Sequence, residues 1–110
     1  MTFSELTAHQ IRSALKNTPG LSERQMFRGV AFMVKGHMCC GVLNENLVVR
    51  VGPDAYEGAL QEPHARPMDF TGRPLHGFVY VERDGFASDR SLRQWIERGM
   101  RFVKTLPPRS

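Results

Sequence analysis

The sequence has only two cysteines, Cys39 and Cys40, which are adjacent in the stretch GHMCCGV. It has no apolar run of about 18 residues, the length that a membrane-spanning helix requires. The N-terminus, MTFSELTAHQIRSALK, lacks the basic-then-apolar pattern of a secretory signal. These absences argue against a disulfide-stapled, membrane-inserted or exported protein. We therefore expect a cytoplasmic chain with free thiols and no membrane contact.

The sequence also lacks the short motifs of common catalytic and cofactor sites. It contains no glycine-framed nucleophile elbow, no phosphate-binding P-loop and no dinucleotide-binding glycine fingerprint. No two of its four histidines have the i, i+4 spacing of a helical metal site. We therefore predict no catalytic residues, no cofactor and no metal, and we expect that the protein is not an enzyme.

The adjacent cysteines fit a buried strand better than a metal or redox site. Neighbouring side chains of a strand point to opposite faces, which prevents two adjacent thiols from sharing one metal ion. The pair lacks the two-residue spacer of zinc and thioredoxin-type motifs, and a disulfide between neighbours is strained. Because free cysteine is among the most buried residue types, we expect strand packing, with a redox-sensitive thiol and a metal ligand as less favoured alternatives.

The size and composition of the chain are those of one globular domain. It has 110 residues, of which 41% are hydrophobic and 24% charged. We therefore treat residues 1–110 as a single domain. Helix signals cover residues 2–17, with Thr2 or Ser4 as N-cap, and residues 52–61. A third helix is expected over residues 88–106, with Ser88 or Asp89 as N-cap and Pro107 and Pro108 after it. Its apolar residues share one face: Leu92, Trp95, Ile96, Gly99, Val103 and Leu106.

The segments between these helices are rich in β-forming residues. Segments 24–34, 37–43 and 47–51 are separated by short turns, which predicts an antiparallel meander. Residues 63–77 hold three prolines and are expected to form an extended, turning connection before a further strand at 77–82. The expected fold class is α+β: an antiparallel sheet of a meander plus one or two further strands, flanked by N-terminal and C-terminal helices and a short middle helix. Because such a sheet has unpaired edges, we also expect a two-fold homodimer.

The net charge of +4 is distributed unevenly along the chain. Residues 1–50 carry +3, residues 51–85 carry −3 and residues 86–110 carry +4. Four basic residues share one face of the last predicted helix, interrupted by Glu97: Arg90, Arg93, Arg101 and Lys104. A solvated helix face is the default interpretation of these charges, and partner docking or weak electrostatic contact is the functional interpretation. Since Glu97 repels phosphate and only Gln94 at the margin could read a base, we predict no sequence-specific DNA binding by this chain alone.

Four other arginines form a candidate ligand site. Arg66 and Arg73 flank Asp69 in the proline-rich segment, where an arginine–aspartate network either pins the loop or binds an anion. Arg28 and Arg50 are likewise either paired within the protein or available to a ligand. If these four arginines converge, they line one pocket for a small molecule or anion, and catalysis there is a further alternative.

Three stretches resemble the N-terminal domain of the TfoX/Sxy family of bacterial competence regulators: MFRGVAFMVKGHMCCGV, LVVRVGPDAY and HARPMDFTGRPLHGFVYV. The resemblance extends in order from the first helix to LRQWIERGMRFVKTLPP. It implies a cytoplasmic bacterial α+β domain. Members of the family assist the cyclic-AMP receptor protein at competence promoters, which implies a non-enzymatic regulatory or protein-interaction domain with a partner in the transcription machinery. The full-length regulators carry a second, C-terminal helical domain, which the resemblance does not include.

Overall fold

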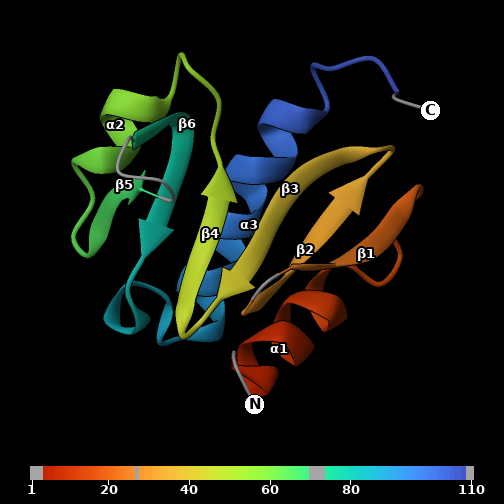
Figure 1. The fold of residues 1–110 in the computed structure, drawn as a ribbon, viewed down its shortest axis with the longest axis horizontal. Coiled ribbons are helices and arrows are strands. Elements are labelled where there is room, and N and C mark those ends of the chain that lie inside the picture. The colour runs from red at the N-terminus through yellow and green to blue at the C-terminus, as the bar shows by residue number, and fades with distance from the viewer. Residues whose placement is uncertain (1–3, 27, 70–73, 109–110) are drawn as a thin grey trace.

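The computed structural model describes residues 4–26, 28–69 and 74–108 (Figure 1). Its elements, in chain order, are α1 (Glu5–Leu15), β1 (Leu21–Met26), β2 (Gly29–Val34), β3 (His37–Leu43), β4 (Asn46–Arg50), α2 (Tyr56–Leu60), β5 (Ala65–Asp69), β6 (Pro74–Val81), the 3-10 helix η1 (Arg83–Phe86) and α3 (Asp89–Val103). The strands form a six-stranded sheet in the order β1-β2-β3-β4-β6-β5, and every neighbouring pair is antiparallel. The predicted α+β fold is confirmed.

The helices cover one face of the sheet. In Figure 1, α3 crosses behind the central strands and α1 lies beside β1 and β2. The main core joins Ile11 of α1 and Leu92 of α3 to inward-facing valines of the strands. A second, smaller cluster on the opposite face consists of strand residues: Leu43, Val48 and Met68, with Met38, Phe78 and Tyr80 packed against them. The hydrophobic residues on one face of the sheet therefore hold α3, whereas those on the opposite face pack against one another.

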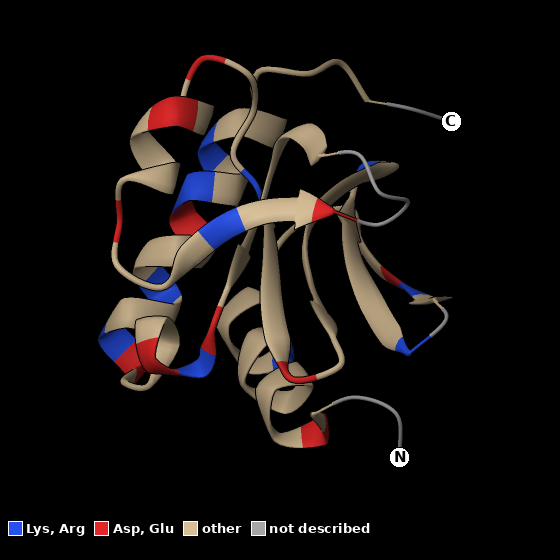
Figure 2. Cartoon of the chain, turned by 60° about the vertical axis from the view of Figure 1, so that its left-hand side comes forward, with Lys and Arg blue, Asp and Glu red and all other residues tan. Residues whose placement is uncertain are grey.

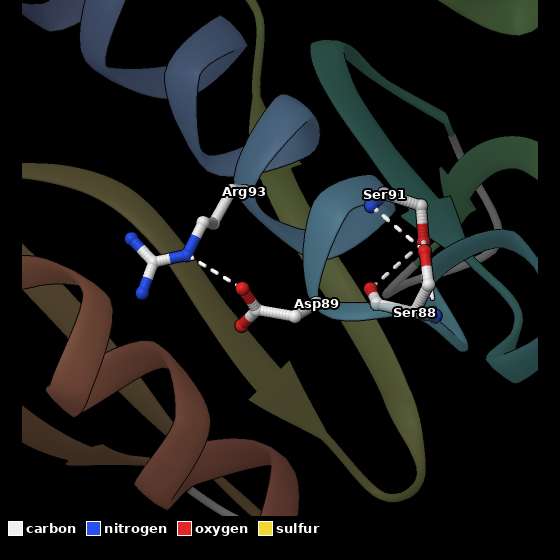
Figure 3. Close-up of polar contacts among 4 residues, drawn as sticks. All are labelled: Ser88, Asp89, Ser91 and Arg93. Carbon is white, nitrogen blue, oxygen red and sulfur yellow. Dashed lines mark hydrogen bonds and ion pairs between the residues drawn. The ribbon is translucent and has the colours of Figure 1, made fainter.

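Side-chain caps set the starts of the two long helices. Ser4 is the N-cap of α1, and its hydroxyl accepts a hydrogen bond from the Thr7 N–H at 3.2 Å. Ser88 caps α3, and the Ser91 side chain bonds back to the Ser88 backbone, so that two orphan N–H groups are satisfied (Figure 3). Both serines were candidate caps in the sequence. Thr2, the other candidate for the first helix, lies outside the described residues.

The segment predicted as one strand over 24–34 is a hairpin of two strands, so that prediction is wrong. Met26 at the end of β1 pairs with Gly29 at the start of β2. Between them Arg28 has a φ of 64°, in the left-handed region that reverses the chain. A Cβ on Gly29 would collide with the Val42 carbonyl oxygen, so glycine is required there. The dense β-forming residues on both sides hid this turn.

The proline-rich segment and the middle helix also differ from prediction. Residues 63–77 contain β5 and the start of β6, where an extended connection was expected. Prolines fit these places because β5 is the outermost strand of the sheet, which holds Pro67, and Pro74 is the first residue of β6. The helix expected over 52–61 is confined to Tyr56–Leu60.

The adjacent cysteines are buried as predicted, but on the same side of the sheet. The register of β2 with β3 shifts between Phe32, which pairs with Cys40, and Met33, which pairs with Met38. Cys39 is thereby the extra residue of a β-bulge, which breaks the alternation of side chains. Both thiols are free, fully buried and part of the main core. The expectation that they point to opposite faces is therefore wrong.

Candidate functional site

The position of α3 depends on a close approach to β3. A Cβ at Gly99 would lie 2.6 Å from the Cys39 carbonyl oxygen and 3.1 Å from the Cys39 Sγ. Only glycine permits this packing without a shift of the helix or the strand. A hydrogen bond of 3.2 Å from Trp95 Nε1 to the Gly85 carbonyl oxygen fixes α3 against η1 as well. These contacts determine which face of α3 remains exposed.

The exposed face of α3 carries the predicted basic residues. We define the basic ridge as Arg90, Arg93, Arg101 and Lys104, all of which are exposed. Arg93 Nε donates to Asp89 Oδ2 at 2.9 Å (Figure 3). The other three cations of the ridge have no carboxylate within ion-pair distance in the described part of the chain. Figure 2 shows Lys and Arg interspersed with Asp and Glu on the helices, and further charged residues of both signs on the strands.

Glu97 interrupts the ridge, as the sequence indicated. The spacing allowed Glu97 to pair with Arg93 or Arg101, but Arg93 pairs with Asp89 one turn earlier. Over the described ranges Glu97 has no ion pair of its own. An uncompensated carboxylate amid the cations weakens the attraction of this face for a phosphate backbone.

Two cavities run along the flank of α3 that faces α1. The first has a volume of about 400 Å³ and is lined by Thr18, Pro19, Val34, Lys35, Met100, Val103, Lys104, Leu106 and Pro108. The second has about 250 Å³ and is lined by Ala14, Leu15, Thr18, Arg93, Ile96, Glu97, Met100 and Lys104. Because the two share Thr18, Met100 and Lys104, they are parts of one depression, which we call the α1–α3 groove.

The sequence did not reveal the α1–α3 groove. Its residues come from α1, the turn before β1, the end of β2 with the β2–β3 turn, and α3 with the segment after it, which are far apart in the chain. The segment after α3 forms part of the wall because His37 Nε2 donates to the Pro107 carbonyl oxygen at 2.7 Å. The signal in the sequence was weak: Ala14 and Met100 lie at the boundaries of apolar helix faces, where burial depends on tertiary packing.

A polar hollow of about 520 Å³ lies on the other flank of α3, lined by Glu62, Gln94, Trp95, Glu97, Arg98 and Arg101. Arg98 spans it, with a terminal nitrogen 3.0 Å from Glu62 Oε2 and the guanidinium carbon 4.8 Å from the Trp95 ring centroid. This ion pair fastens α3 to the chain after α2. Arg98 is thus neutralised internally, whereas Arg101 and Glu97 line the hollow as charges of opposite sign without an ion pair in the described ranges.

Among the candidate ligand arginines that the structure describes, Arg28 and Arg50 lie at opposite ends of β4. Arg28 lies beside Asn44, whose N–H donates to the Arg28 carbonyl oxygen at 2.8 Å, whereas Arg50 is at the far end of β4. Arg66 on β5 has a terminal nitrogen 3.4 Å from Glu82 Oε2. Arg73 lies outside the described residues. Among the described residues, no cluster of three or more His, Cys, Asp or Glu side chains fits a metal ion.

Arg50 has an unusual aromatic environment. Its guanidinium carbon lies 5.4 Å from the Phe78 ring centroid and 5.2 Å from the Phe102 ring centroid. Gly52 makes room for Phe102, since a Cβ there would collide with the ring. In the described part of the chain no carboxylate pairs with Arg50. Two aromatic rings thus hold the guanidinium while its in-plane donors stay available.

The comparisons with known proteins concern the family and the fold. The model of the TfoX N-terminal domain matches residues 13–103. The crystal structure of the Deinococcus radiodurans protein DR2400, whose family-model domain is DUF419, superposes with a TM-score of 0.67 at 19% identity, covering 90% of this chain and 79% of that one. At that identity the likeness concerns the fold alone. No curated protein matches the chain. No helix within the described ranges is long and apolar enough to cross a bilayer.

Proposed function

Because the chain belongs to the TfoX N-terminal domain family, we propose that it is a non-enzymatic protein-interaction domain of transcription regulation, similar in role to the competence regulators. It acts in the cytoplasm on a protein of the transcription machinery. The observation that carries this proposal is the basic ridge of α3, where Arg90, Arg101 and Lys104 are exposed and have no carboxylate partner among the described residues.

Physical considerations support the ridge as a docking surface for protein. From Arg90 to Lys104 it extends over roughly 21 Å of helix, at about 1.5 Å per residue. Cations that are not neutralised internally steer an acidic partner and fix its orientation. Because the hydrophobic core holds α3 in place, this helix loses little conformational entropy when a partner binds.

Recognition of a DNA sequence is not part of the proposal. The ridge has no asparagine, Gln94 lies at its margin and Glu97 sits in its middle. Bidentate contacts to base edges require side chains that this face lacks. Any affinity for a duplex is expected to be weak, independent of sequence and strongly reduced by salt.

The test compares two variants with equal changes of charge. Arg90→Glu/Arg101→Glu reverses two cations of the ridge, and Arg24→Glu/Arg66→Glu reverses two exposed cations on strands. Each tagged protein is expressed in its native cells, cross-linked, captured and analysed by quantitative mass spectrometry. We expect the wild type and the strand variant to retain the same transcription proteins and the ridge variant to lose them at least about fivefold, the effect of two contacts of about 0.5 kcal/mol each. Equal recovery with both variants contradicts the proposal.

A second candidate function rests on Arg50. Its guanidinium, stacked against Phe78 and Phe102, is suited to a small anion with a phosphate or carboxylate group, and catalysis on that ligand is included in this alternative. Titration with inorganic phosphate and with citrate, followed by NMR of arginine Nε–H signals, tests it. A saturable shift of the Arg50 signal that disappears in Phe102→Leu favours the alternative, and the absence of any shift up to millimolar concentrations rejects it.

A further inference from the structure

The α1–α3 groove has the length of a short helix. Along α3 its lining extends from Arg93 to Lys104, which is roughly 16 Å at about 1.5 Å per residue, or three helical turns. Its two parts have volumes of about 400 and 250 Å³ and join at Thr18, Met100 and Lys104. The groove therefore accommodates one face of a helix of about 12 residues laid alongside α3.

The lining of the groove is apolar between charged margins. Its accessible apolar side chains are Ala14, Pro19, Met100, Leu106 and Pro108, and the buried side chains Leu15, Val34, Ile96 and Val103 lie beneath them. A flexible methionine such as half-buried Met100 adapts to the shape of a bound side chain. An exposed depression of this composition gains free energy when a partner covers it with apolar residues.

The margins are basic. Three cations line the groove, Lys35, Lys104 and Arg93, against one acid, Glu97. Within the described ranges neither lysine has a carboxylate partner, whereas Arg93 shares Asp89. A ligand that matches both the basic margins and the apolar floor of the groove therefore carries a stripe of apolar side chains with carboxylates on either side.

We propose that the α1–α3 groove binds an amphipathic, acidic helix of a protein partner. The inference rests on the proposed function, because it names the surface and the chemistry through which the partner docks. A nucleic acid would match the cations but would leave the apolar floor uncovered. A second copy of this chain is disfavoured as the occupant of the groove, since a chain of net charge +4 would bring like charge to a basic margin; the expected dimer would form through the edge strands of the sheet instead.

The probe is a set of three capped peptides of 14 residues. The first has leucines at i, i+3, i+4 and i+7 with glutamates beside them, the second has lysines in place of the glutamates, and the third is a scramble of the first. Binding is measured by calorimetry, and the contact surface by amide shifts of the protein in NMR. We expect the acidic amphipathic peptide to bind at least about tenfold more tightly than the other two, with the largest shifts at Ala14, Thr18 and Met100.

Variants then locate the site. Met100→Glu places a carboxylate in the apolar floor and is expected to weaken binding of the acidic peptide at least about tenfold, whereas Met100→Leu retains it. Lys104→Glu, at an exposed position that the fold does not need, is expected to weaken binding about threefold to fivefold. The matched control Arg24→Glu, on β1, changes the charge equally and is expected to leave affinity unchanged.

The outcomes separate this inference from the proposed function. Absence of binding up to millimolar peptide, equal binding of the lysine peptide, or shifts confined to other surfaces overturns the groove assignment. So does occupation of the groove by a DNA duplex or by decanoate when the acidic peptide fails to bind. If the ridge variant Arg90→Glu/Arg101→Glu loses native partners while Met100→Glu, which changes the groove alone, keeps them, the groove inference fails and the ridge proposal stands.

Discussion

Replacement of Gly99 by alanine tests the contact that positions α3. The new methyl group would lie 2.6 Å from the Cys39 carbonyl oxygen and 3.1 Å from the Cys39 Sγ, both shorter than ordinary contact. Because the first of these atoms belongs to the backbone of β3, the helix or the strand has to shift. Overpacking of this kind costs about 1–3 kcal/mol. Alanine recovers about 1 kcal/mol of helix propensity, so the net loss of stability is at most about 2 kcal/mol.

Gly58→Ala provides the matched control. Gly58 is also helical, in α2, and a Cβ there has no atom within 4 Å. Its replacement therefore gains helix propensity without a clash and is expected to stabilise the protein by up to about 1 kcal/mol. The difference between the two variants isolates the cost of the Gly99–Cys39 contact.

Urea denaturation at equilibrium, followed by far-UV circular dichroism, measures both variants. We expect Gly99→Ala to unfold at a lower urea concentration than the wild type and Gly58→Ala at the same or a higher one, with unchanged m-values. If Gly99→Ala is as stable as Gly58→Ala, the close approach of α3 to β3 is not real. The derived geometry of the ridge and the groove would then be wrong as well.

Three further predictions concern the cysteine pair, one ion pair and self-association. A hydrogen bond with Cys39, together with burial, raises the pKa of Cys40 well above its usual value of 9.0. Because the thiol of the unfolded chain ionises first, the free energy of unfolding falls as the pH rises above about 9. Urea titrations at several pH values are expected to show a smaller fall for Cys40→Ala than for the wild type. Arg12 donates to both carboxylate oxygens of Glu23, at 2.6 and 2.9 Å, and lowers the pKa of Glu23. The stabilisation by this ion pair is present at neutral pH and is lost as the pH falls through the pKa of Glu23 in the folded state. Because the pair is exposed, a double-mutant cycle is expected to give a coupling energy of less than about 1 kcal/mol. With β1 and β5 at the edges of the sheet, light scattering at micromolar concentration is expected to give the mass of a dimer, and the mass of a monomer contradicts this.

The most regular part of the fold followed from the sequence. In α3 the apolar spacing predicted the buried face, and Ser88 was a recognisable cap. Both signals are local, since periodicity and capping involve residues within a few positions of one another. The exposure of the basic ridge followed from the same periodicity.

The predictions that were wrong concerned features that depend on residues distant in the sequence or on weak turn signals. The bulge at Cys39 exists only in the register of β3 against β2, which no local pattern encodes. The turn before Gly29 lacks the usual Asn-Gly or Asp-Gly pair and was hidden among strand-forming residues. In β5 the prolines suggested a loop, although an outermost strand tolerates proline.

The same distinction between local and long-range features applies to the candidate site. The basic ridge lies on a single helix and was predicted, whereas the α1–α3 groove joins Ala14, Lys35 and Met100 from separate elements and was not. The stacking of Arg50 between Phe78 and Phe102 required knowledge of where α3 ends relative to β4. Sequence spacing gives no access to such long-range proximity.

Site-specific photo-cross-linking tests most directly the claim that the exposed face of α3 docks a protein. A benzophenone amino acid replaces Glu97, which lies within the ridge and also lines the groove, and in a matched variant it replaces Arg24 on β1. Both proteins are irradiated in their native cells, and the adducts are analysed by mass spectrometry. We predict a protein adduct at position 97 whose cross-linked peptide is acidic and amphipathic, and little adduct at position 24. Equal adducts at the two positions, or an adduct with DNA at position 97, would contradict the account.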